Sequence, residues 1–522
     1  MFEVEPTPYY YLSRRKMRSH FPKTANLSHL LRRFLASISP IRLILAFVTV
    51  ALAVLVYQSS LQHSETAVPG GDGASPLQSF TRSVASNLSD LFSRRILFSP
   101  NLSRWSIANM ISLGPGLAVL DGRTTTVPSA YPPLEELEYL FVDLVRQYPN
   151  LVTIQKIGTS TAWQQPIYGI RISNESKEND DEPAVLFSSL HHAREPVGVF
   201  ICKAIMQELL SNYGTSPSHT RLVDSLEIWL VPIVNPDGYR YLMENQRNFP
   251  WWRKNLRDNN NDGRFDPMVD GVDLNRNYDY NWGDGGDGNP GSWFYRGSQA
   301  FSEMEIQAIR DLALRRNFVM GVSYHSYGEA ILYPWANYHR PPDQDLILDV
   351  ARQCAKQITQ LSGKGSYHVL PLNGRVGQSS IWMYGELGAI DFICETGDDY
   401  FANPEDIPHI VQQNVRGAMH LMERALRSGI HGHVVDAETR QPLSAEIHVR
   451  GYETTYVRPR HSSGTTGSYD RLLLPGSYVV EVAKPGYETA RLEQVLVQEQ
   501  GRTLLDVELR RMAVEDVTSG GN

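Results

Sequence analysis

The stretch from Ala184 to Leu210 restricts the possible folds more than any other part of the chain. Ala184–Phe187 is an apolar run short enough for a buried strand, and Val197–Leu210 carries apolar residues at helical spacing. His192 and Glu195 lie between them, where the strand gives way to the helix. An imidazole and a carboxylate three residues apart can bind one ion, and a catalytic zinc needs three protein ligands and one open position. The stretch therefore predicts part of a metal site.

The third ligand must come from another part of the chain, and His325 is the best candidate. It ends a β-type run, as the first pair of ligands does. His191 is predicted to point away from the site, because successive residues of an extended chain face opposite sides. A His-x-x-Glu pair alone is more often an ordinary surface pair, so the prediction needs further motifs.

Five further motifs occur in a fixed order along the chain. They are Asn-Pro-Asp-Gly at 235–238, Trp-Arg-Lys-Asn at 252–255, Gly-Val-Asp-Leu-Asn-Arg-Asn at 271–277, His-Ser-Tyr at 325–327 and Phe-Ile-Cys-Glu-Thr at 392–396. Their order and spacing resemble the zinc metallocarboxypeptidase family (peptidase M14, the carboxypeptidase A/T-like branch). The resemblance covers residues 131–428. It implies one Zn²⁺ per chain held by His192, Glu195 and His325, and release of C-terminal residues from peptides or proteins.

Two residues are candidates for the chemical step. Glu395 follows an apolar run, where a carboxylate is costly unless it is paired or used. It is either the partner of a structural ion pair or a general base beside a zinc-bound water, and the resemblance implies the general base. Arg253 matches the arginine of the family that stabilises the negative charge developing on the carbonyl oxygen.

An exopeptidase must also hold a free C-terminal carboxylate. A planar guanidinium together with an amide suits that task. The resemblance assigns this clamp to Asn275 and Arg276, and it matches Arg194 to an arginine on the substrate side.

The sequence departs from the family where a mobile tyrosine covers the substrate. Asn373 occupies that offset. Tyr384 matches a separate structural tyrosine of the family. An insertion in the segment 370–380 would let Tyr367 reach the substrate, so Tyr367 is the candidate substrate-binding tyrosine. Ser380 falls at the position that determines specificity, where a neutral residue disfavours a purely basic preference, while nearby Arg375 would attract acidic side chains.

An acidic stretch before the clamp is similar to the start of a calcium loop. The candidate structural Ca²⁺ ligands are Asp258, Asn260, Asp262 and Asp266. Val269 stands where such a loop has its terminal glutamate, so an acidic surface turn is the alternative.

The pattern of elements predicts an α/β fold with a mixed central sheet and helices on both faces, of the carboxypeptidase type, over 131–428. The expected strands include 152–157, 167–172, 184–187 and 226–234, and the expected helices are 134–146, 197–213, 302–316, 343–361 and 407–427. Ligands then gather in loops at the strand ends.

Short alternating strands replace this pattern after residue 428. A small β-sandwich is predicted for 429–511, followed by a tail at 512–522. Its turn motifs, including Leu-Pro-Gly at 474–476, resemble the transthyretin-like domain that follows some regulatory carboxypeptidases. His431 and His433 alternate on a strand without a third ligand nearby, so they are predicted to face solvent.

The N-terminal region predicts attachment to a membrane. A basic tail at 1–40 precedes an apolar segment at 41–57, and the basic side should stay in the cytoplasm. We expect an uncleaved transmembrane signal anchor, with a cleaved signal, a twin-arginine export signal or a buried soluble helix as alternatives. Residues 58–130 read as a Ser/Gly/Pro-rich stalk or linker. The catalytic domain would then lie outside the cytoplasm at the cell surface or in the secretory pathway, or be secreted. Asn87, Asn101 and Asn174 begin N-glycosylation sequons, which have meaning only in a eukaryotic secretory route.

Composition narrows the possible partners. The net charge of −8 gives no basic excess, so no nucleic-acid partner is expected, and three cysteines do not make a disulfide framework. The expected partners are peptide or protein C-termini and a membrane. Two alternatives stay open. One is a zinc amidase or endopeptidase that acts on γ-linked or cell-wall-type peptides, and the other is a non-catalytic binding ectodomain.

Overall fold

The structure is a computed structural model, and it describes residues 127–174, 181–334, 340–372, 376–454 and 457–512. The chain divides into two compact units, Met1–Asn101 and Leu102–Asn522, and every described residue belongs to the second unit. The predicted membrane anchor and most of the predicted stalk lie outside the described residues.

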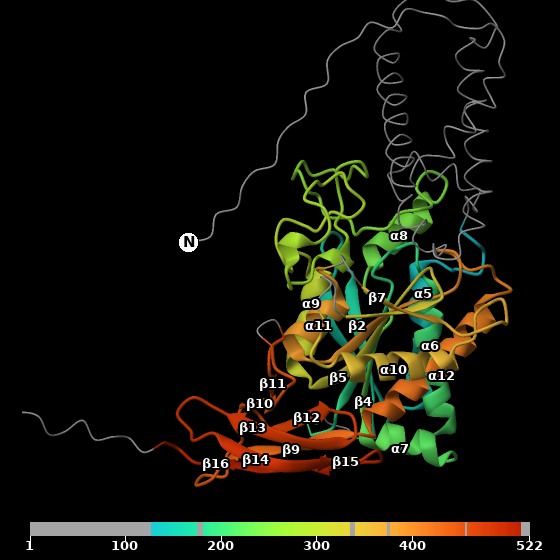
Figure 1. Cartoon of the computed structure of the whole chain (residues 1–522). Helices are drawn as coiled ribbons and strands as arrows, with labels where there is room; N and C mark the ends of the chain where they lie inside the picture. Colours follow the sequence, from blue (N-terminus) through green and yellow to red (C-terminus); the bar gives the residue numbers. More distant parts are fainter. Residues whose placement is uncertain (1–126, 175–180, 335–339, 373–375, 455–456, 513–522) are drawn as a thin grey trace, which may run out of the picture. The chain divides into compact units, whose positions relative to one another are not determined.

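An eight-stranded mixed sheet forms the centre of the catalytic part (Figure 1). The strand order is β1-β2-β4-β3-β5-β8-β6-β7. The strands are β1 (Val152–Thr159), β2 (Pro166–Ile172), β3 (Ala184–Ser189), β4 (Glu227–Val231), β5 (Phe318–His325), β6 (Ala330–Tyr333), β7 (His368–Pro371) and β8 (Ile390–Glu395). The central strands β4, β3, β5 and β8 run parallel, and β1, β2 and β6 join the sheet through antiparallel pairs.

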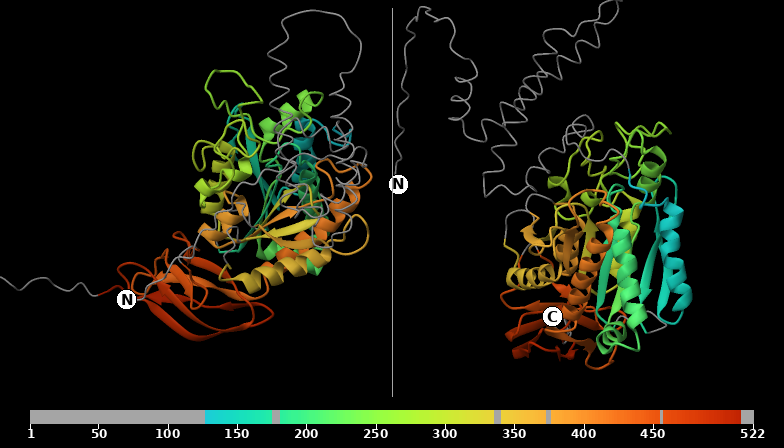
Figure 2. Two further views of the ribbon diagram at one scale, coloured as in Figure 1. Left: turned by 45° about the horizontal axis from the view of Figure 1, so that its top comes forward. Right: turned by 90° about the vertical axis from the view of Figure 1, so that its right-hand side faces the viewer.

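Helices cover both faces of this sheet. They are α5 (Leu134–Gln147), α6 (Val197–Asn212), α7 (Pro217–Ser225), α8 (Pro236–Asn245), α9 (Met304–Arg315), α10 (Gln344–Gln357), α11 (Ser379–Leu387) and α12 (Ile407–Ala425), with short 3-10 turns at Leu274–Arg276 and Trp282–Asp284. On one face α6 and α12 lie side by side, and α10 packs against α12 (Figure 2). The opposite face is covered by α9 and part of α11.

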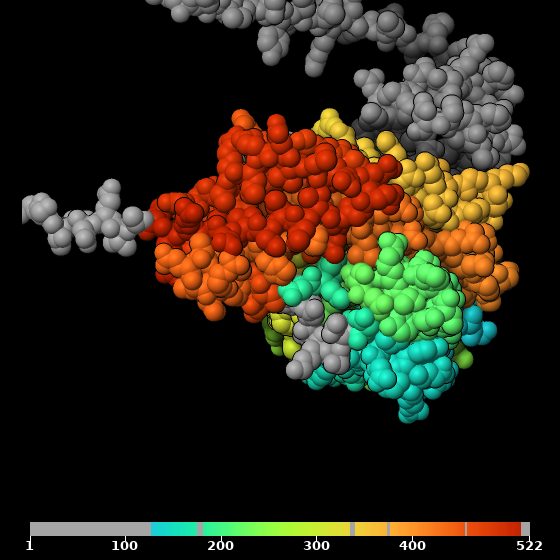
Figure 3. All heavy atoms as spheres, turned by 90° about the horizontal axis from the view of Figure 1, so that it is seen from below, coloured from blue at the N-terminus to red at the C-terminus, as the bar shows by residue number. Residues whose placement is uncertain are grey.

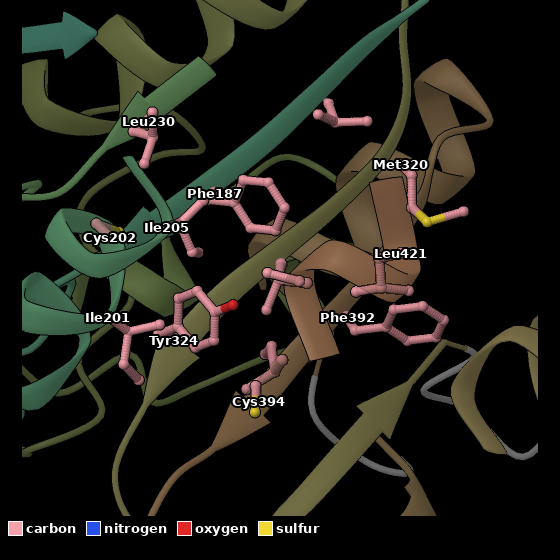
Figure 4. Close-up of a cluster of buried hydrophobic side chains, with 14 of the residues drawn as sticks. Phe187, Ile201, Cys202, Ile205, Leu230, Met320, Tyr324, Phe392, Cys394 and Leu421 are labelled. Atoms are coloured by element: carbon pink, nitrogen blue, oxygen red, sulfur yellow. The ribbon is translucent and has the colours of Figure 1, made fainter. Parts of the chain in front are cut away.

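The alternating side chains of the central strands explain why the core has two halves. Phe187 belongs to the larger apolar cluster beneath α6 and α12, whereas Leu186 belongs to the smaller cluster beneath α9. Figure 4 shows Phe187 together with Tyr324 and Phe392, from three neighbouring strands, in the larger cluster. A strand that is buried on both faces needs the continuous apolar sequence seen at 184–187.

The C-terminal part is a β-sandwich with its own apolar core. One sheet has the order β11-β10-β13-β14, and the other has β12-β9-β15 with β16 also paired to β9. The strands are β9 (Gly429–Asp436), β10 (Glu446–Val449), β11 (Arg460–His461), β12 (Ser468–Leu472), β13 (Gly476–Ala483), β14 (Ala490–Val497), β15 (Arg502–Leu504) and β16 (Val507–Leu509). Figure 3 shows the face of the molecule that these strands form, in red and orange.

The predicted α/β class and mixed sheet are confirmed, and the predicted helices begin and end within a few residues of α5, α6, α9, α10 and α12. The short helices α7, α8 and α11 were not predicted. No helix among the described residues combines the length and the apolar character needed to cross a membrane.

Candidate active site

Three neighbouring parallel strands bring the predicted ligands to one edge of the sheet. The loop after β3 carries His192 and Glu195, β5 ends at His325, and β8 ends at Glu395. The carboxyl ends of parallel strands meet at the same edge, which is where α/β sheets usually bind ligands. Residues far apart in sequence therefore converge here.

The three predicted metal ligands form a tight, buried triangle. His192 Nδ1 lies 2.8 Å from Glu195 Oε2 and 3.1 Å from His325 Nδ1, and His325 Nδ1 lies 2.9 Å from the same carboxylate oxygen. Each residue is no more than 3% exposed. Among the described residues, no other His, Cys, Asp or Glu group has ligand atoms gathered closely enough for a metal ion.

A second carboxylate, Asp273, orients this triangle. Its Oδ1 lies 3.1 Å from His192 Nε2, and its Oδ2 accepts a hydrogen bond of 3.0 Å from Arg253 Nε. Arg253 Nη1 also lies 3.3 Å from Glu195 Oε1. Burial works against the charge of Arg253, but Asp273 and Glu195 outweigh it and hold the pKa of the guanidinium above its ordinary value. An acidic partner behind a metal-binding imidazole fixes the tautomer and the ring orientation.

His191 takes no part in the triangle. Its Nε2 lies 2.9 Å from the Tyr278 hydroxyl, and its Nδ1 lies 3.2 Å from Ser323 Oγ. Both ring nitrogens therefore have partners outside the metal site, in agreement with the prediction that His191 is not a ligand.

Glu395 stands beside the metal site through strand register. It is paired with His325 across β5 and β8, so the two side chains leave the sheet at the same level. Glu395 is partly exposed, whereas Glu195 is only 2% exposed. The candidate base is therefore the more accessible of the two carboxylates.

The predicted carboxylate clamp lies on the other side of His325. Asn275 Nδ2 is 3.2 Å from His325 Nε2, and Asn275 Oδ1 accepts a hydrogen bond of 3.0 Å from the backbone amide of Ser379, the first residue of α11. Arg276 donates to the carbonyl of Asn275 at 2.7 Å and stacks over Phe294 with 5.6 Å to the ring centroid.

Arg194 lies in an aromatic group that the sequence did not predict. Its guanidinium carbon is 3.9 Å from the ring centroid of Tyr400, and its Nη2 donates to the Tyr400 hydroxyl at 3.1 Å. Tyr327 packs edge-on against Tyr400 at 4.9 Å. Tyr400 lies five residues after Glu395 in a loop of mixed composition, so no local signal marked it. Asp273 was recoverable, because it stands within the motif at 271–277.

Tyr367 lies in a position that does not fit the predicted contact with substrate. It is 4% exposed within the larger core, and its hydroxyl accepts hydrogen bonds from the Gly397 amide at 3.3 Å and from Asn414 Nδ2 at 3.4 Å. This placement favours a structural role. Asn373 and Arg375 lie outside the described residues.

The acidic stretch before the clamp forms a loop of turns. Asp258 Oδ2 accepts a hydrogen bond of 2.8 Å from the Gly263 amide, and Asp262 Oδ1 accepts one of 2.8 Å from the Arg264 amide. Asn260 and Asp262 are exposed. These bonds account for the turns without an ion, so calcium stays a prediction.

The donor set fits zinc. Two imidazole nitrogens and one carboxylate oxygen are typical zinc ligands, and three such ligands leave the fourth position open. His192 and His325 point Nδ1 at each other and at Glu195, whereas their Nε2 atoms have the second partners that zinc-binding histidines use. A shared cation among three lone-pair donors explains this convergence.

Comparisons with known proteins agree with this site. The family model for zinc carboxypeptidases matches residues 137–417, which is more than half of the chain. The chain therefore belongs to the zinc carboxypeptidase family, peptidase M14.

Individual relatives match the same region. The chain is 32% identical over 274 residues to carboxypeptidase A2 of Mus musculus, covering 52% of this chain and 61% of that protein. It is 29% identical over 296 residues to carboxypeptidase B of Bos taurus, covering 54% and 67%. The chain spans about three fifths of the length of the first relatives it matches.

Solved structures share the fold. Carboxypeptidase A from Helicoverpa armigera superposes with a TM-score of 0.50 at 25% identity, covering 58% of this chain and 76% of that chain. Thrombin-activatable fibrinolysis inhibitor has a TM-score of 0.50 at 24% identity, covering 56% and 73%.

Proposed function

We propose that the chain is a zinc-dependent metallocarboxypeptidase that releases single residues from the C-termini of peptides or proteins. The observation that carries this proposal is the register of β5 and β8, which pairs Glu395 with His325 at the edge of the triangle of ligands. A candidate base, a candidate zinc site and a candidate carboxylate clamp thereby lie next to one another. The proposal is also in keeping with the carboxypeptidases to which the chain is similar.

Zinc, when bound, would polarise the scissile carbonyl and lower the pKa of a water molecule. Glu395 accepts a proton from the attacking water and then transfers it to the leaving amine, as a general base and acid at one carboxylate. The guanidinium of Arg253, held by Asp273, stabilises the negative charge that develops on the carbonyl oxygen. Because Asp273 also holds His192, one carboxylate orients the metal site and the charge-stabilising arginine together.

Asn275 and Arg276 give the enzyme its preference for the last peptide bond. A guanidinium and an amide together bind a free carboxylate through charge-assisted hydrogen bonds. Asn275 is anchored by the Ser379 amide, so the clamp is set in place before the substrate arrives. An amidated C-terminus lacks the negative charge and loses most of this binding.

The Arg276→Ala variant tests this assignment. A charge-assisted contact of this kind contributes on the order of 2–5 kcal/mol, which corresponds to roughly 30- to 4,000-fold in kcat/KM. We expect that loss on peptides with a free C-terminus and little change on the same peptides with an amidated C-terminus. Arg296→Ala is a matched control, because Arg296 stacks on Trp282 at 4.9 Å and bonds the Gly285 carbonyl in a neighbouring loop. An equal loss on free and amidated peptides would instead favour an amidase or endopeptidase.

We also propose a structural Ca²⁺ at Asp258, Asn260, Asp262 and Asp266, on the strength of the sequence pattern. Millimolar Ca²⁺ should raise the Tm of the wild type, and Asp262→Ala should abolish the increase. A wild-type Tm that does not respond to Ca²⁺ argues against this site.

The location of the enzyme is a further proposal that rests on the sequence alone. The basic segment 1–40 and the apolar segment 41–57 support a membrane anchor with the catalytic part outside the cytoplasm. Protease present on the non-cytoplasmic side of intact membranes should then digest the catalytic part. Protection of that part on the cytosolic side would refute the proposal.

A further inference from the structure

Helix α11 connects the substrate clamp with the C-terminal β-sandwich. At its first residue, the Ser379 amide holds Asn275 of the clamp. Just before the helix, the carbonyl of Gly377 accepts a hydrogen bond of 3.1 Å from the Tyr278 amide, and its backbone packs closely against the carbonyl of Arg276. After the helix, the chain enters β8, which ends at Glu395. A displacement of α11 would therefore change the positions of both Asn275 and Glu395.

The other half of α11 contacts a buried ion pair formed with the sandwich. Arg471 of β12 donates to the two carboxylate oxygens of Asp343 at 2.8 and 3.3 Å. The Tyr384 hydroxyl, on α11, donates to Asp343 Oδ2 at 3.1 Å. Asp343 and Tyr384 are no more than 1% exposed, and Arg471 is 2% exposed. One carboxylate thus joins the helix to the sandwich in a dry environment.

Two more arginines of the sandwich hold the end of α11. The Arg458 amide donates to the Gly385 carbonyl at 2.8 Å, and its side chain pairs with Glu386 at 2.8 Å. The guanidinium of Arg460 lies against Gly388. A Cβ atom added at Gly388 would overlap Arg460 Nη1, so a larger residue would clash there. Gly388 has φ of +68°, so two independent constraints require glycine at this turn.

Apolar packing supports the same contact. Leu472 of β12 and Val457, which precedes β11, belong to the larger core of the catalytic part and not to the core of the sandwich. Contacts between domains of one chain are usually polar and permit relative motion. The buried ion pair and the shared core residues therefore make the contact between the sandwich and the catalytic part more rigid than a usual polar contact between domains.

We propose that the C-terminal β-sandwich fixes helix α11 through Arg471, Asp343 and Tyr384, and that it thereby positions the carboxylate clamp for substrate binding. The three residues are positioning residues, because none of them reaches the substrate. The proposal rests on the proposed carboxypeptidase function for its kinetic consequence, but the mechanical link between the sandwich and α11 does not depend on it.

Tyr384→Phe is the sharpest test, because it removes only the hydroxyl that joins α11 to Asp343. A hydrogen bond to a charged group contributes measurably to stability, yet losing one leaves the fold in place. We expect KM for peptides with a free C-terminus to rise about threefold or more, with kcat within about twofold of wild type and zinc content unchanged. The control is Tyr487→Phe, which removes a similar bond of 2.9 Å to Asp436 inside the sandwich and should leave KM unchanged.

Arg471 provides a graded series on the other side of the ion pair. Arg471→Lys keeps the charge but loses the two-pronged geometry, and Arg471→Met loses both. KM should rise from wild type to the lysine variant and again to the methionine variant. If the methionine variant does not fold, the lysine variant still decides the order.

Hydrogen exchange separates this proposal from the proposed function, because it needs no turnover. The backbone amides of 377–387 should exchange faster in Tyr384→Phe than in wild type or in Tyr487→Phe. If the wild type has no peptidase activity but the amides of 377–387 still exchange faster in Tyr384→Phe, the proposed function is overturned and the link between the sandwich and α11 is supported. Unchanged exchange, or a KM in Tyr384→Phe equal to that of Tyr487→Phe, would overturn the link.

Discussion

Two buried clusters of carboxylates and guanidinium groups in this protein have similar composition, but their polar atoms are arranged in opposite ways. At the metal site, Glu195 and Asp273 contact Arg253, and at the sandwich contact, Asp343 contacts Arg471 with Arg460 nearby. In the first cluster the ligand atoms point toward one another and leave a common centre. In the second, the hydrogen bonds of Arg471 and Tyr384 close around the Asp343 carboxylate.

The difference shows what distinguishes a reactive site from a structural one. Burial of charge is common to both clusters, so burial alone does not identify chemistry. Two imidazole nitrogens and a carboxylate oxygen that converge on one point form a donor set for a cation, whereas in the second cluster each carboxylate oxygen already has a hydrogen-bond donor. The predictions below test this distinction, beginning with the largest expected effect.

Removing the candidate base should abolish turnover while leaving the metal site whole. Glu395→Gln keeps the shape but cannot accept the proton, so we expect kcat to fall by at least about a thousandfold, the upper part of the range for general bases. His325→Ala should lose both activity and zinc, because it removes one of three ligands. Metal analysis of the purified variants, together with rates on a free C-terminal peptide, measures both. Zinc bound equally by wild type and His325→Ala would contradict the ligand assignment.

This part of the site could be predicted because its signals are local. His192 and Glu195 are three residues apart, and His325 and Glu395 each end an apolar run, so strand ends in a parallel sheet bring them together. The fold class could be predicted for the same reason, because the alternation of strands and helices is also read from local sequence patterns. The candidate zinc ligands thus follow from short-range spacing and sheet topology, together with the five ordered motifs that resemble the zinc carboxypeptidases.

The second cluster could not be predicted in this way. Arg471 and Asp343 are separated by 128 residues, and no spacing rule links a β-sandwich to the start of a helix. Tyr367 shows the same limit. Asn373 occupies the offset expected for the substrate tyrosine, and Tyr367 was predicted as its nearby substitute, but the structure places Tyr367 in the core with its hydroxyl bonded to Asn414. Tyr400 was missed because its contact with Arg194 also depends on tertiary packing.

The next largest effect should separate the two clusters by what they support. Asp343→Asn leaves the guanidinium of Arg471 buried without its partner, and breaking a buried ion pair costs about 3–5 kcal/mol. Denaturant unfolding should show that loss, with zinc affinity unchanged. Asp273→Asn should instead lower zinc affinity about 10- to 100-fold, the usual effect of losing a partner of a metal-binding imidazole. Equal effects of the two substitutions on zinc affinity would erase the distinction.

The smallest effect concerns another buried carboxylate, Glu305, which forms no ion pair with an arginine among the residues that the structure describes. Its side chain accepts hydrogen bonds from Thr161 Oγ1 at 2.5 Å and from Asn255 Nδ2 at 3.3 Å, and Glu303 shares the Asn255 amide at 2.7 Å. Burial, and then the neighbouring Glu303, raise the pKa of Glu305 to about 7.

Asp343 behaves in the opposite way, because Arg471 and Arg460 overcome its burial and hold its pKa below its ordinary value.

The two directions predict opposite dependence of stability on pH. A carboxyl whose pKa is raised on folding binds a proton more tightly in the folded state, so its contribution is complete below the unfolded pKa and is lost as pH rises through about 7. The contribution of Asp343 is present above its unfolded pKa and is lost as pH falls.

The Glu305→Gln variant cannot ionise and keeps the hydrogen-bonding shape of the protonated acid. Its free energy of unfolding relative to wild type should therefore increase between pH 5 and pH 8 by roughly 1–3 kcal/mol. Urea unfolding of both proteins at the two pH values measures it, and a difference that stays constant with pH would show that Glu305 remains ionised despite its burial.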